Sequence, residues 1–215
     1  MVIKNILLDL DGTLTDPKVG ITTSARYGLA KVGHVVAEDV DLDWIIGPPL
    51  KASLAKILNV ELDDDLAEQA LIGYRERFSV TGLFENQVYP EVDKTLNSLK
   101  ARGFNLFLAT AKPTIYAKQI LAHFNLSHYF DEIYGSELSG ERTNKGDLIA
   151  YILDQEQLNP SECLMVGDRE YDILGARRHG IETIAVEYGY GSAAEIDAAQ
   201  PKARIQHFKQ LLEYV

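Results

Sequence analysis

Residues 6–16 read Ile-Leu-Leu-Asp-Leu-Asp-Gly-Thr-Leu-Thr-Asp, and they predict how the chain begins its fold. A short apolar run passes directly into acidic residues and a glycine, which is typical of a buried strand that ends in a turn. Side chains two residues apart in an extended chain point to the same side, so the carboxylates of Asp9 and Asp11 are expected to share one pocket. Gly12 allows the sharp turn that follows and lets backbone N–H groups approach an anion. We therefore expect a strand over 6–10 that delivers two carboxylates to one site.

Four further short apolar runs follow, at residues 105–110, 132–134, 163–167 and 182–187. Between them lie segments of helical period, each able to cover one face of a sheet. This alternation predicts an α/β fold with a Rossmann-like, three-layer α/β/α core around a parallel sheet. Small or polar residues follow several strands, as in Ala-Thr-Ala-Lys-Pro at 109–113 and Val-Gly-Asp-Arg-Glu at 166–170. Because ligands bind at the carboxyl ends of such strands, several strands are expected to contribute to one site.

Residues 16–86 interrupt this alternation with helical patterns alone. Apolar residues recur there at helical spacing in three stripes: Ile21, Ala25, Leu29 and Val32; Leu50, Leu54 and Leu58; and Leu66, Ala70 and Tyr74. Gly47-Pro48-Pro49 separates two of the helices. We therefore expect a core made of residues 1–15 and 87–215, with a small all-helical cap domain over 16–86. Two linkers, around 16–17 and 85–90, would join these parts.

The composition excludes several classes of protein. The 215 residues include 32 acidic residues against 21 Lys and Arg, which gives a net charge of −11 and argues against a nucleic-acid partner. No apolar stretch approaches the roughly 20 residues of a membrane helix, and the N-terminus lacks a signal-peptide pattern. Cys163 is the single cysteine, so no internal disulfide forms. We expect a cytoplasmic monomer or homodimer that acts on a small molecule and binds neither nucleic acid nor membranes.

The pair Asp9 and Asp11 suits catalysis. One carboxylate of such a pair can act as a nucleophile and the other as an acid and base, provided that their surroundings differ. A simpler interpretation is that both residues only cap a turn. A calcium-binding loop is excluded, because the glycine comes fourth instead of sixth and the twelfth residue is Gly20 instead of glutamate.

The sequence Asp-Leu-Asp-Gly-Thr-Leu-Thr-Asp at 9–16 resembles the first motif of the haloacid dehalogenase-like (HAD) hydrolase superfamily. Three other stretches resemble the remaining motifs of that family, in the same order. Thr110 ends a predicted strand, Lys145 lies in Thr-Asn-Lys-Gly-Asp, and residues 167–172 read Gly-Asp-Arg-Glu-Tyr-Asp, which is similar to GDxxxD. The helical insertion stands where this family places its C1-type cap, so the resemblance covers the whole chain.

The resemblance implies a Mg²⁺-dependent phosphatase that forms an aspartyl-phosphate. Asp9 would be the nucleophile and Asp11 the acid and base, while the ammonium of Lys145 would offset the negative charge. Phosphate would be bound by Thr110, by the N–H of Ala111 and at Gly12. Mg²⁺ prefers oxygen ligands, and the residues implied for it are Asp9, Asp168, Asp172 and the backbone carbonyl of Asp11.

Each of these residues also has a structural interpretation. Thr110 can simply end a strand, and Lys145 can be a surface lysine in a loop. Asp168 and Asp172 can cap the helix that follows them, although that role accounts for one of them more easily than for both. Cys163 lies in an apolar run and is expected to be a buried thiol without a catalytic role. The five histidines show no metal-binding spacing.

The expected function is hydrolysis of a small phosphate monoester. Gly-Pro-Pro-Leu at 47–50 and Tyr-Pro-Glu-Val at 89–92 resemble phosphoglycolate phosphatases. The third motif departs from the Lys-Pro-x-Pro of many of those enzymes and is closer to 5′-nucleotidase-like relatives. Lys51 and Arg75 are candidates for contacting the leaving group. A sugar phosphomutase of the β-phosphoglucomutase kind is the alternative, and a non-enzymatic binding protein is a more distant one.

Overall fold

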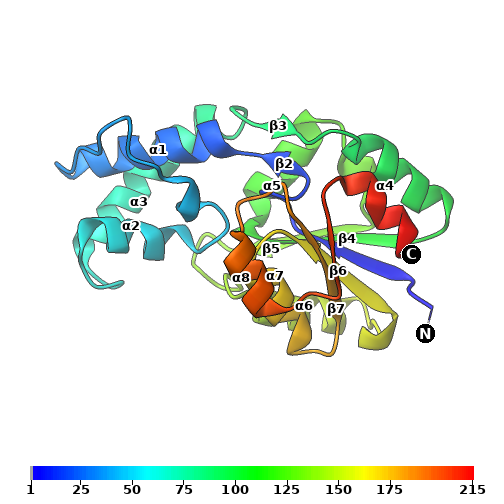
Figure 1. Ribbon diagram of the computed structural model, residues 1–215. Coiled ribbons are helices and arrows are strands. Elements are labelled where there is room, and N and C mark those ends of the chain that lie inside the picture. Colours follow the sequence, from blue (N-terminus) through cyan, green and yellow to red (C-terminus); the bar gives the residue numbers. More distant parts are fainter. Residues whose placement is uncertain (1) are drawn as a thin grey trace. The chain divides into compact units, whose positions relative to one another are not determined.

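The computed structural model describes residues 2–215, which divide into two compact units. Unit 1 comprises the chain up to Asp16 together with Val88–Val215, and unit 2 comprises Pro17–Gln87 (Figure 1). Each boundary lies one residue from the one that we expected. Two short strands, β2 (Thr15–Asp16) and β3 (Gln87–Val88), pair with each other where the chain passes from one unit to the other.

Unit 1 is built on a six-stranded sheet in the order β5-β4-β1-β6-β7-β8, and every pairing in it is parallel. The central strand β1 pairs with β4 on one side and β6 on the other, so that Leu7 lies opposite Phe107 and Met165. This sheet confirms the predicted Rossmann-like α/β class. The strands are β1 (Asn5–Leu8), β4 (Asn105–Pro113), β5 (Glu132–Ser136), β6 (Cys163–Gly167), β7 (Glu182–Val186) and β8 (Ala203–Ile205).

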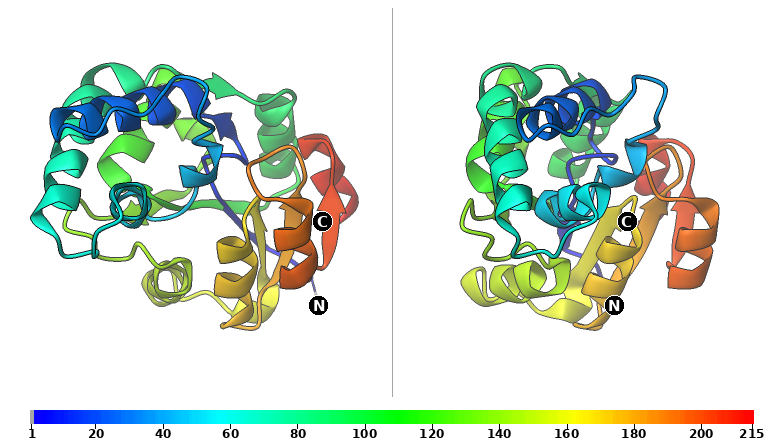
Figure 2. Two further views of the ribbon diagram at one scale, coloured as in Figure 1. Left: turned by 60° about the vertical axis from the view of Figure 1, so that its left-hand side comes forward. Right: turned by 90° about the vertical axis from the view of Figure 1, so that its left-hand side faces the viewer.

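Helices flank this sheet (Figure 2). Leu7, Phe107 and Met165 pack with apolar residues of α6, including Leu148 and Ile152, in one fully buried cluster. The helical periodicity between the strands is therefore explained by burial against the sheet. The α-helices of unit 1 are α4 (Val92–Ala101), α5 (Thr114–His123), α6 (Lys145–Gln155), α7 (Glu170–Arg177) and α8 (Ala193–Ala199), and the short 3₁₀ turns are η3 (Ser127–Tyr129), η4 (Pro160–Glu162) and η5 (Phe208–Glu213).

Within the six-stranded sheet, β8 and β4 differ most from the sequence prediction. The edge strand β8 was not expected, because its three residues, Ala203–Ile205, include a charged arginine and are too few to show a strand pattern. β4 continues past Thr110 to Pro113, where it pairs with Ser136 of β5 after a shift in register. This continuation places Lys112 in the strand extension that leads into the site.

Unit 2 consists of helices. Helix α1 packs closely on α3 because Gly28 has no side chain, and a Cβ there would lie 2.3 Å from the carbonyl oxygen of Ala70. Asp64 caps α3 by accepting the N–H of Leu66 at 2.7 Å. The elements are α1 (Lys18–Lys31), η1 (Asp43–Ile45), α2 (Leu50–Leu58), α3 (Asp65–Arg77) and the π-helical turn η2 (Phe78–Gly82). Within residues 2–215, no helix is both long and apolar enough to cross a membrane.

Candidate active site

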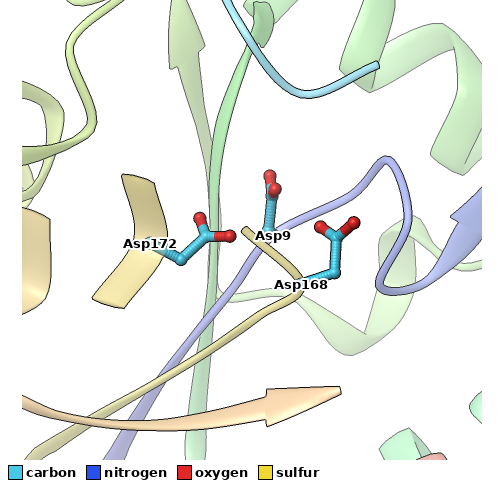
Figure 3. Close-up of side chains that lie close together, drawn as sticks. All are labelled: Asp9, Asp168 and Asp172. Atoms are coloured by element: carbon cyan, nitrogen blue, oxygen red, sulfur yellow. The ribbon is translucent and has the colours of Figure 1, made fainter. Parts of the chain in front are cut away.

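The candidate site lies at the carboxyl ends of β1, β4 and β6 in unit 1. Asp9 follows β1 directly, and its N–H donates to the carbonyl of Val166 at 3.0 Å, which continues the parallel pairing as far as Asp9. Asp168 follows β6, and Asp172 lies in the first turn of α7. The three carboxylates lie close together (Figure 3). Topology therefore brings together residues that are up to 163 positions apart in the sequence.

The turn after Asp9 depends on Gly12 in two ways. Gly12 has φ +78°, a left-handed conformation that favours glycine, and it donates its N–H to the carbonyl of Thr15 at 2.8 Å. A Cβ at this position would also lie 2.2 Å from Oδ2 of Asp168. The Gly12 N–H is used within the turn, and binding of phosphate by backbone N–H groups around Gly12 stays a prediction. The glycine also makes room for the Asp168 carboxylate.

Lys145 lies at the centre of the carboxylates. Asn144 caps α6 by accepting the N–H groups of Gly146 and Asp147, which makes Lys145 the first helical residue. The Lys145 ammonium lies 2.7 Å from Asp172 and 3.0 Å from Asp9, and the side chain is only 4% exposed. It also donates to the carbonyl of Ala109 at 2.7 Å. Lys145 is therefore a buried cation directed at Asp9 in this structure.

Burial alone would lower the pKa of Lys145. The negative charges of Asp172 and Asp9 outweigh that effect, so its pKa is raised above the ordinary value. The ammonium consequently remains charged throughout the physiological pH range and can interact with an anion beside Asp9.

Asp172 performs two tasks at once. Its Oδ2 accepts the N–H of Arg169 at 3.1 Å and so caps α7, while its Oδ1 faces the Lys145 ammonium. The helix-capping interpretation therefore holds for this side chain, while its role as a metal ligand stays a prediction. Gly167 provides the space, because a Cβ there would lie 2.2 Å from Cγ of Asp172. Burial, partly offset by Lys145, raises the pKa of Asp172 to about 6.

Asp168 is almost completely buried. Its Oδ2 accepts the backbone N–H of Tyr190 at 2.7 Å, and its Oδ1 lies 3.5 Å from the hydroxyl of Thr13. Burial, together with the charges of Asp172 and Asp9, raises the pKa of Asp168 well above the ordinary value for aspartate. The carboxylates of this cluster therefore repel one another when no further cation is bound.

Asp11 has a cation of its own, which the sequence analysis missed. Its Oδ2 forms an ion pair with the Lys112 ammonium at 2.8 Å, and both side chains are nearly buried, with exposed fractions of 11% and 5%. Burial raises the pKa of Asp11, although Lys112 opposes that effect. The signal was present in Ala-Thr-Ala-Lys-Pro, where Lys112 follows the motif residue Thr110 by two positions. The two motif aspartates thus lie in different electrostatic surroundings.

The predicted phosphate-binding residues of β4 line the same end of the sheet. Thr110 is buried, and its hydroxyl accepts the N–H of Lys112 at 3.3 Å. Ala111 accepts a hydrogen bond from the Ser136 hydroxyl through its carbonyl oxygen at 2.7 Å. Of the two leaving-group candidates in unit 2, Lys51 forms an ion pair with Glu68 at 2.7 Å. Arg75 lies on α3.

A divalent metal ion fits this cluster. One oxygen from each of Asp9, Asp168 and Asp172 can be chosen so that all lie within 4.8 Å of one another, and oxygen is the donor that Mg²⁺ prefers. Oδ1 of Asp9 and Oδ1 of Asp172 are buried, and they accept no well-aligned hydrogen bond from the described residues despite their ion pairs with Lys145. Because three carboxylates face one ammonium, a further cation would relieve the excess negative charge.

The family described as haloacid dehalogenase-like hydrolase matches residues 6–186. This chain belongs to that family. The match covers most of unit 1 and all of unit 2, whereas the motif resemblance was expected to cover the whole chain.

Relatives of this HAD-like hydrolase include enzymes with named substrates. A 5′-nucleotidase of Pseudomonas aeruginosa is 45% identical over 212 residues, which cover 97% of this chain and 95% of that protein. A phosphoglycolate phosphatase of Vibrio vulnificus is 31% identical over 221 residues, with 99% and 96% covered. The crystal structure of a predicted phosphatase from Clostridium acetobutylicum is 40% identical, with a TM-score of 0.93 and coverage of 99% and 100%. These relatives confirm the expected enzyme class, a phosphoric monoester hydrolase.

The raised pKa of Asp172 predicts how the stability of this HAD-like hydrolase depends on pH. Between its ordinary value of 3.8 and about 6, the folded state binds more protons at this residue than the unfolded state does. Without metal, Asp172 therefore lowers the free energy of unfolding as pH rises through this window, by ~3 kcal/mol in total. Urea unfolding of the wild type and of Asp172→Asn, in chelator at pH 4 and pH 7, measures this contribution. The wild type should lose stability relative to the variant between pH 4 and pH 7. If the two proteins differed in free energy of unfolding by the same amount at both pH values, the raised pKa of Asp172 would be contradicted.

The Lys112–Asp11 ion pair makes a second prediction about this hydrolase. Lys112→Met leaves the Asp11 carboxylate buried without its cation and should lower the free energy of unfolding by ~3 kcal/mol at pH 7. Adding Asp11→Asn should restore most of the loss, because the buried charge is then gone. Lys209→Met is the matched control, since Lys209 pairs with Glu91 at the surface and such pairs contribute under ~1 kcal/mol. If Lys112→Met and Lys209→Met lost equal amounts of stability, Lys112 would not stabilise the buried Asp11 carboxylate.

Proposed function

We propose that this chain is a Mg²⁺-dependent phosphatase that hydrolyses small-molecule phosphate monoesters through an aspartyl-phosphate on Asp9. One observation carries the proposal: the two motif aspartates pair with different lysines. Asp9 lies 3.0 Å from Lys145, within the carboxylate cluster, whereas Asp11 lies 2.8 Å from Lys112. Two carboxylates in different surroundings can divide the tasks of nucleophile and of acid and base.

Mg²⁺ would be held by Asp9, Asp168 and Asp172, with the backbone carbonyl of Asp11. When bound, the ion supplies positive charge between a carboxylate and a phosphate, two anions that otherwise repel each other. Lys145 contributes a second positive charge beside Asp9, and its raised pKa keeps the ammonium protonated. These residues explain how an anionic nucleophile can approach an anionic substrate.

In the first step, a carboxylate oxygen of Asp9 attacks phosphorus, and the bond between phosphorus and the ester oxygen breaks. The leaving alkoxide takes a proton from the carboxylic acid of Asp11, so the alcohol departs neutral. Burial raises the pKa of Asp11 and so favours its protonated form. The hydroxyl of Thr110 and the N–H of Ala111 would bind the phosphoryl oxygens.

In the second step, the Asp11 carboxylate takes a proton from water, and the water oxygen attacks phosphorus. The bond between Asp9 and phosphorus breaks and releases inorganic phosphate, which returns Asp9 to its carboxylate form. Dividing the hydrolysis into two displacements lets one residue, Asp11, act first as acid and then as base.

The first substrate candidates are nucleoside 5′-monophosphates. The support is the 5′-nucleotidase relative, which is 45% identical over nearly the full length of both chains. Phosphoglycolate is the second candidate, supported by the relative at 31% identity and by the resemblance of residues 47–50 and 89–92. Lys51 and Arg75 of unit 2 remain candidates for recognising the leaving group.

The test is release of inorganic phosphate from a panel of monoesters, with Mg²⁺ and with chelator. The panel contains nucleoside 5′-monophosphates, phosphoglycolate, hexose phosphates and an aryl phosphate, and Asp9→Asn serves as the blank. We expect Mg²⁺-dependent release that the variant lacks, with nucleotides hydrolysed fastest. An isomerised hexose phosphate without phosphate release would identify a phosphomutase. No reaction with any ester would overturn the proposed function.

A further inference from the structure

The segment Tyr188–Gly191, with the sequence Tyr-Gly-Tyr-Gly, lies against the residues that would hold the metal. It follows β7 and has no role in the chemistry described above. Its two glycines contact Asp168 so closely that no other residue fits. A Cβ at Gly189 would lie 2.3 Å from Cβ of Asp168, and a Cβ at Gly191 would lie 2.0 Å from the Asp168 carbonyl oxygen.

A left-handed backbone conformation does not explain why these two positions are glycine, because neither Gly189 nor Gly191 has a positive φ. The close approach has a result that the structure shows directly: the N–H of Tyr190 reaches Oδ2 of Asp168 at 2.7 Å. This bond restrains the orientation of the carboxylate. The same Cβ at Gly189 would also lie 2.5 Å from the carbonyl oxygen of Gly12, so the segment packs against the turn after Asp9 as well.

The two tyrosine side chains anchor the segment to that turn and to the neighbouring chain. The Tyr188 hydroxyl donates to the carbonyl of Thr13 at 2.8 Å, and its ring lies 4.6 Å from the ring of Tyr89 between centroids. The Tyr190 hydroxyl bonds to the carboxylate of Asp16. Each contact joins residues of unit 1, so the segment is held from several sides while its backbone holds Asp168.

We propose that Tyr188–Gly191 is a positioning element of the metal site, which orients the Asp168 carboxylate through the Tyr190 N–H and holds the turn at 10–14 through the Tyr188 hydroxyl. The inference rests on the proposed function, because it assigns the segment to the Mg²⁺ site of that enzyme. Groups that orient metal ligands typically change metal affinity by 10- to 100-fold when they are altered. The two glycines are then required because they let the backbone of the segment approach Asp168. The two tyrosines are required because their hydroxyl bonds hold that backbone in position.

The test is a calorimetric titration of the full chain with Mg²⁺ alone, without substrate. Gly189→Ala pushes Asp168 away and should raise the dissociation constant for Mg²⁺ by roughly 10- to 100-fold. Gly103→Ala is the control, because Gly103 has no atom near its Cβ position and lies in a left-handed conformation in the loop before β4. It should lose stability through backbone strain and keep the affinity of the wild type.

A second pair of variants decides the question if Gly189→Ala does not fold. Tyr188→Phe removes only the hydroxyl that donates to Thr13 and should raise the dissociation constant about fivefold, the equivalent of one net hydrogen bond. Tyr129→Phe removes a hydroxyl bond of the same 2.8 Å length, to Asp93, away from the site and should leave the affinity unchanged.

The outcomes separate this inference from the proposed function. Folded Gly189→Ala, or Tyr188→Phe, with the Mg²⁺ affinity of the wild type would overturn the positioning role, even if the enzyme hydrolyses esters as proposed. A wild type that binds Mg²⁺ but releases no phosphate would overturn the proposed function, while weaker binding by the variants would still support the positioning role. A wild type that binds no Mg²⁺ would contradict both.

Discussion

Asp9→Asn should lower the turnover of a phosphate monoester by at least about three orders of magnitude and leave the fold intact. The amide is a far weaker nucleophile than the carboxylate, so the covalent step is lost. The fold should survive, because an amide of nearly equal size replaces one of three mutually repelling carboxylates beside Lys145. Phosphate release under saturating substrate measures the first effect, and the melting temperature measures the second.

Asp63→Asn is the matched control for this change, because it alters the same chemical group in unit 2, before α3, and on an exposed residue. Its turnover and melting temperature should equal those of the wild type. If Asp9→Asn retained turnover close to that of the control, Asp9 could not be the nucleophile, and the proposed mechanism would fail at its first step.

Asp11→Asn should reduce turnover by an amount that depends on the leaving group. General acid catalysis contributes about 10²- to 10⁴-fold when the leaving alkoxide needs a proton. The loss with a nucleoside 5′-monophosphate should fall in that range. An aryl phosphate should show a much smaller loss in its first covalent step, because a phenolate departs without protonation. Rapid-mixing measurements of the first turnover, made with both esters, give the loss of rate for each ester.

The two losses must differ if Asp11 is the acid. Equal losses with alkyl and aryl esters would mean that Asp11 acts by holding the site together instead of by donating a proton. Lys112→Met offers a check on that alternative, because it removes the partner of Asp11 at 2.8 Å without removing the carboxyl group.

Much of the site follows from local sequence. The apolar run before Asp9 predicts the strand, and the residues at its carboxyl end are placed by the parallel topology that the alternating pattern indicates. The Gly-Asp-Arg-Glu-Tyr-Asp stretch likewise places Asp168 after a strand and Asp172 one turn into a helix. The pattern is informative here because each residue takes its position from the element beside it.

Other parts depend on contacts between distant segments, which no local pattern reveals. Lys112 meets Asp11 only because β4 lies next to β1 and continues beyond Thr110. Tyr190 meets Asp168 only through a close backbone approach that two glycines permit. Gly12 was recognised as a turn residue, but the space that it leaves for Asp168 became visible only in the folded chain.

The most direct test of the central claim is to find the phosphoryl group on Asp9. In Asp11→Asn, an aryl phosphate should still phosphorylate Asp9, while the missing base should slow attack by water. The covalent intermediate should therefore accumulate, and acid quenching followed by peptide mass spectrometry should find one phosphoryl group on the peptide that contains Asp9. Phosphate release without phosphorylation of that peptide, or a phosphoryl group on another residue, would contradict the mechanism.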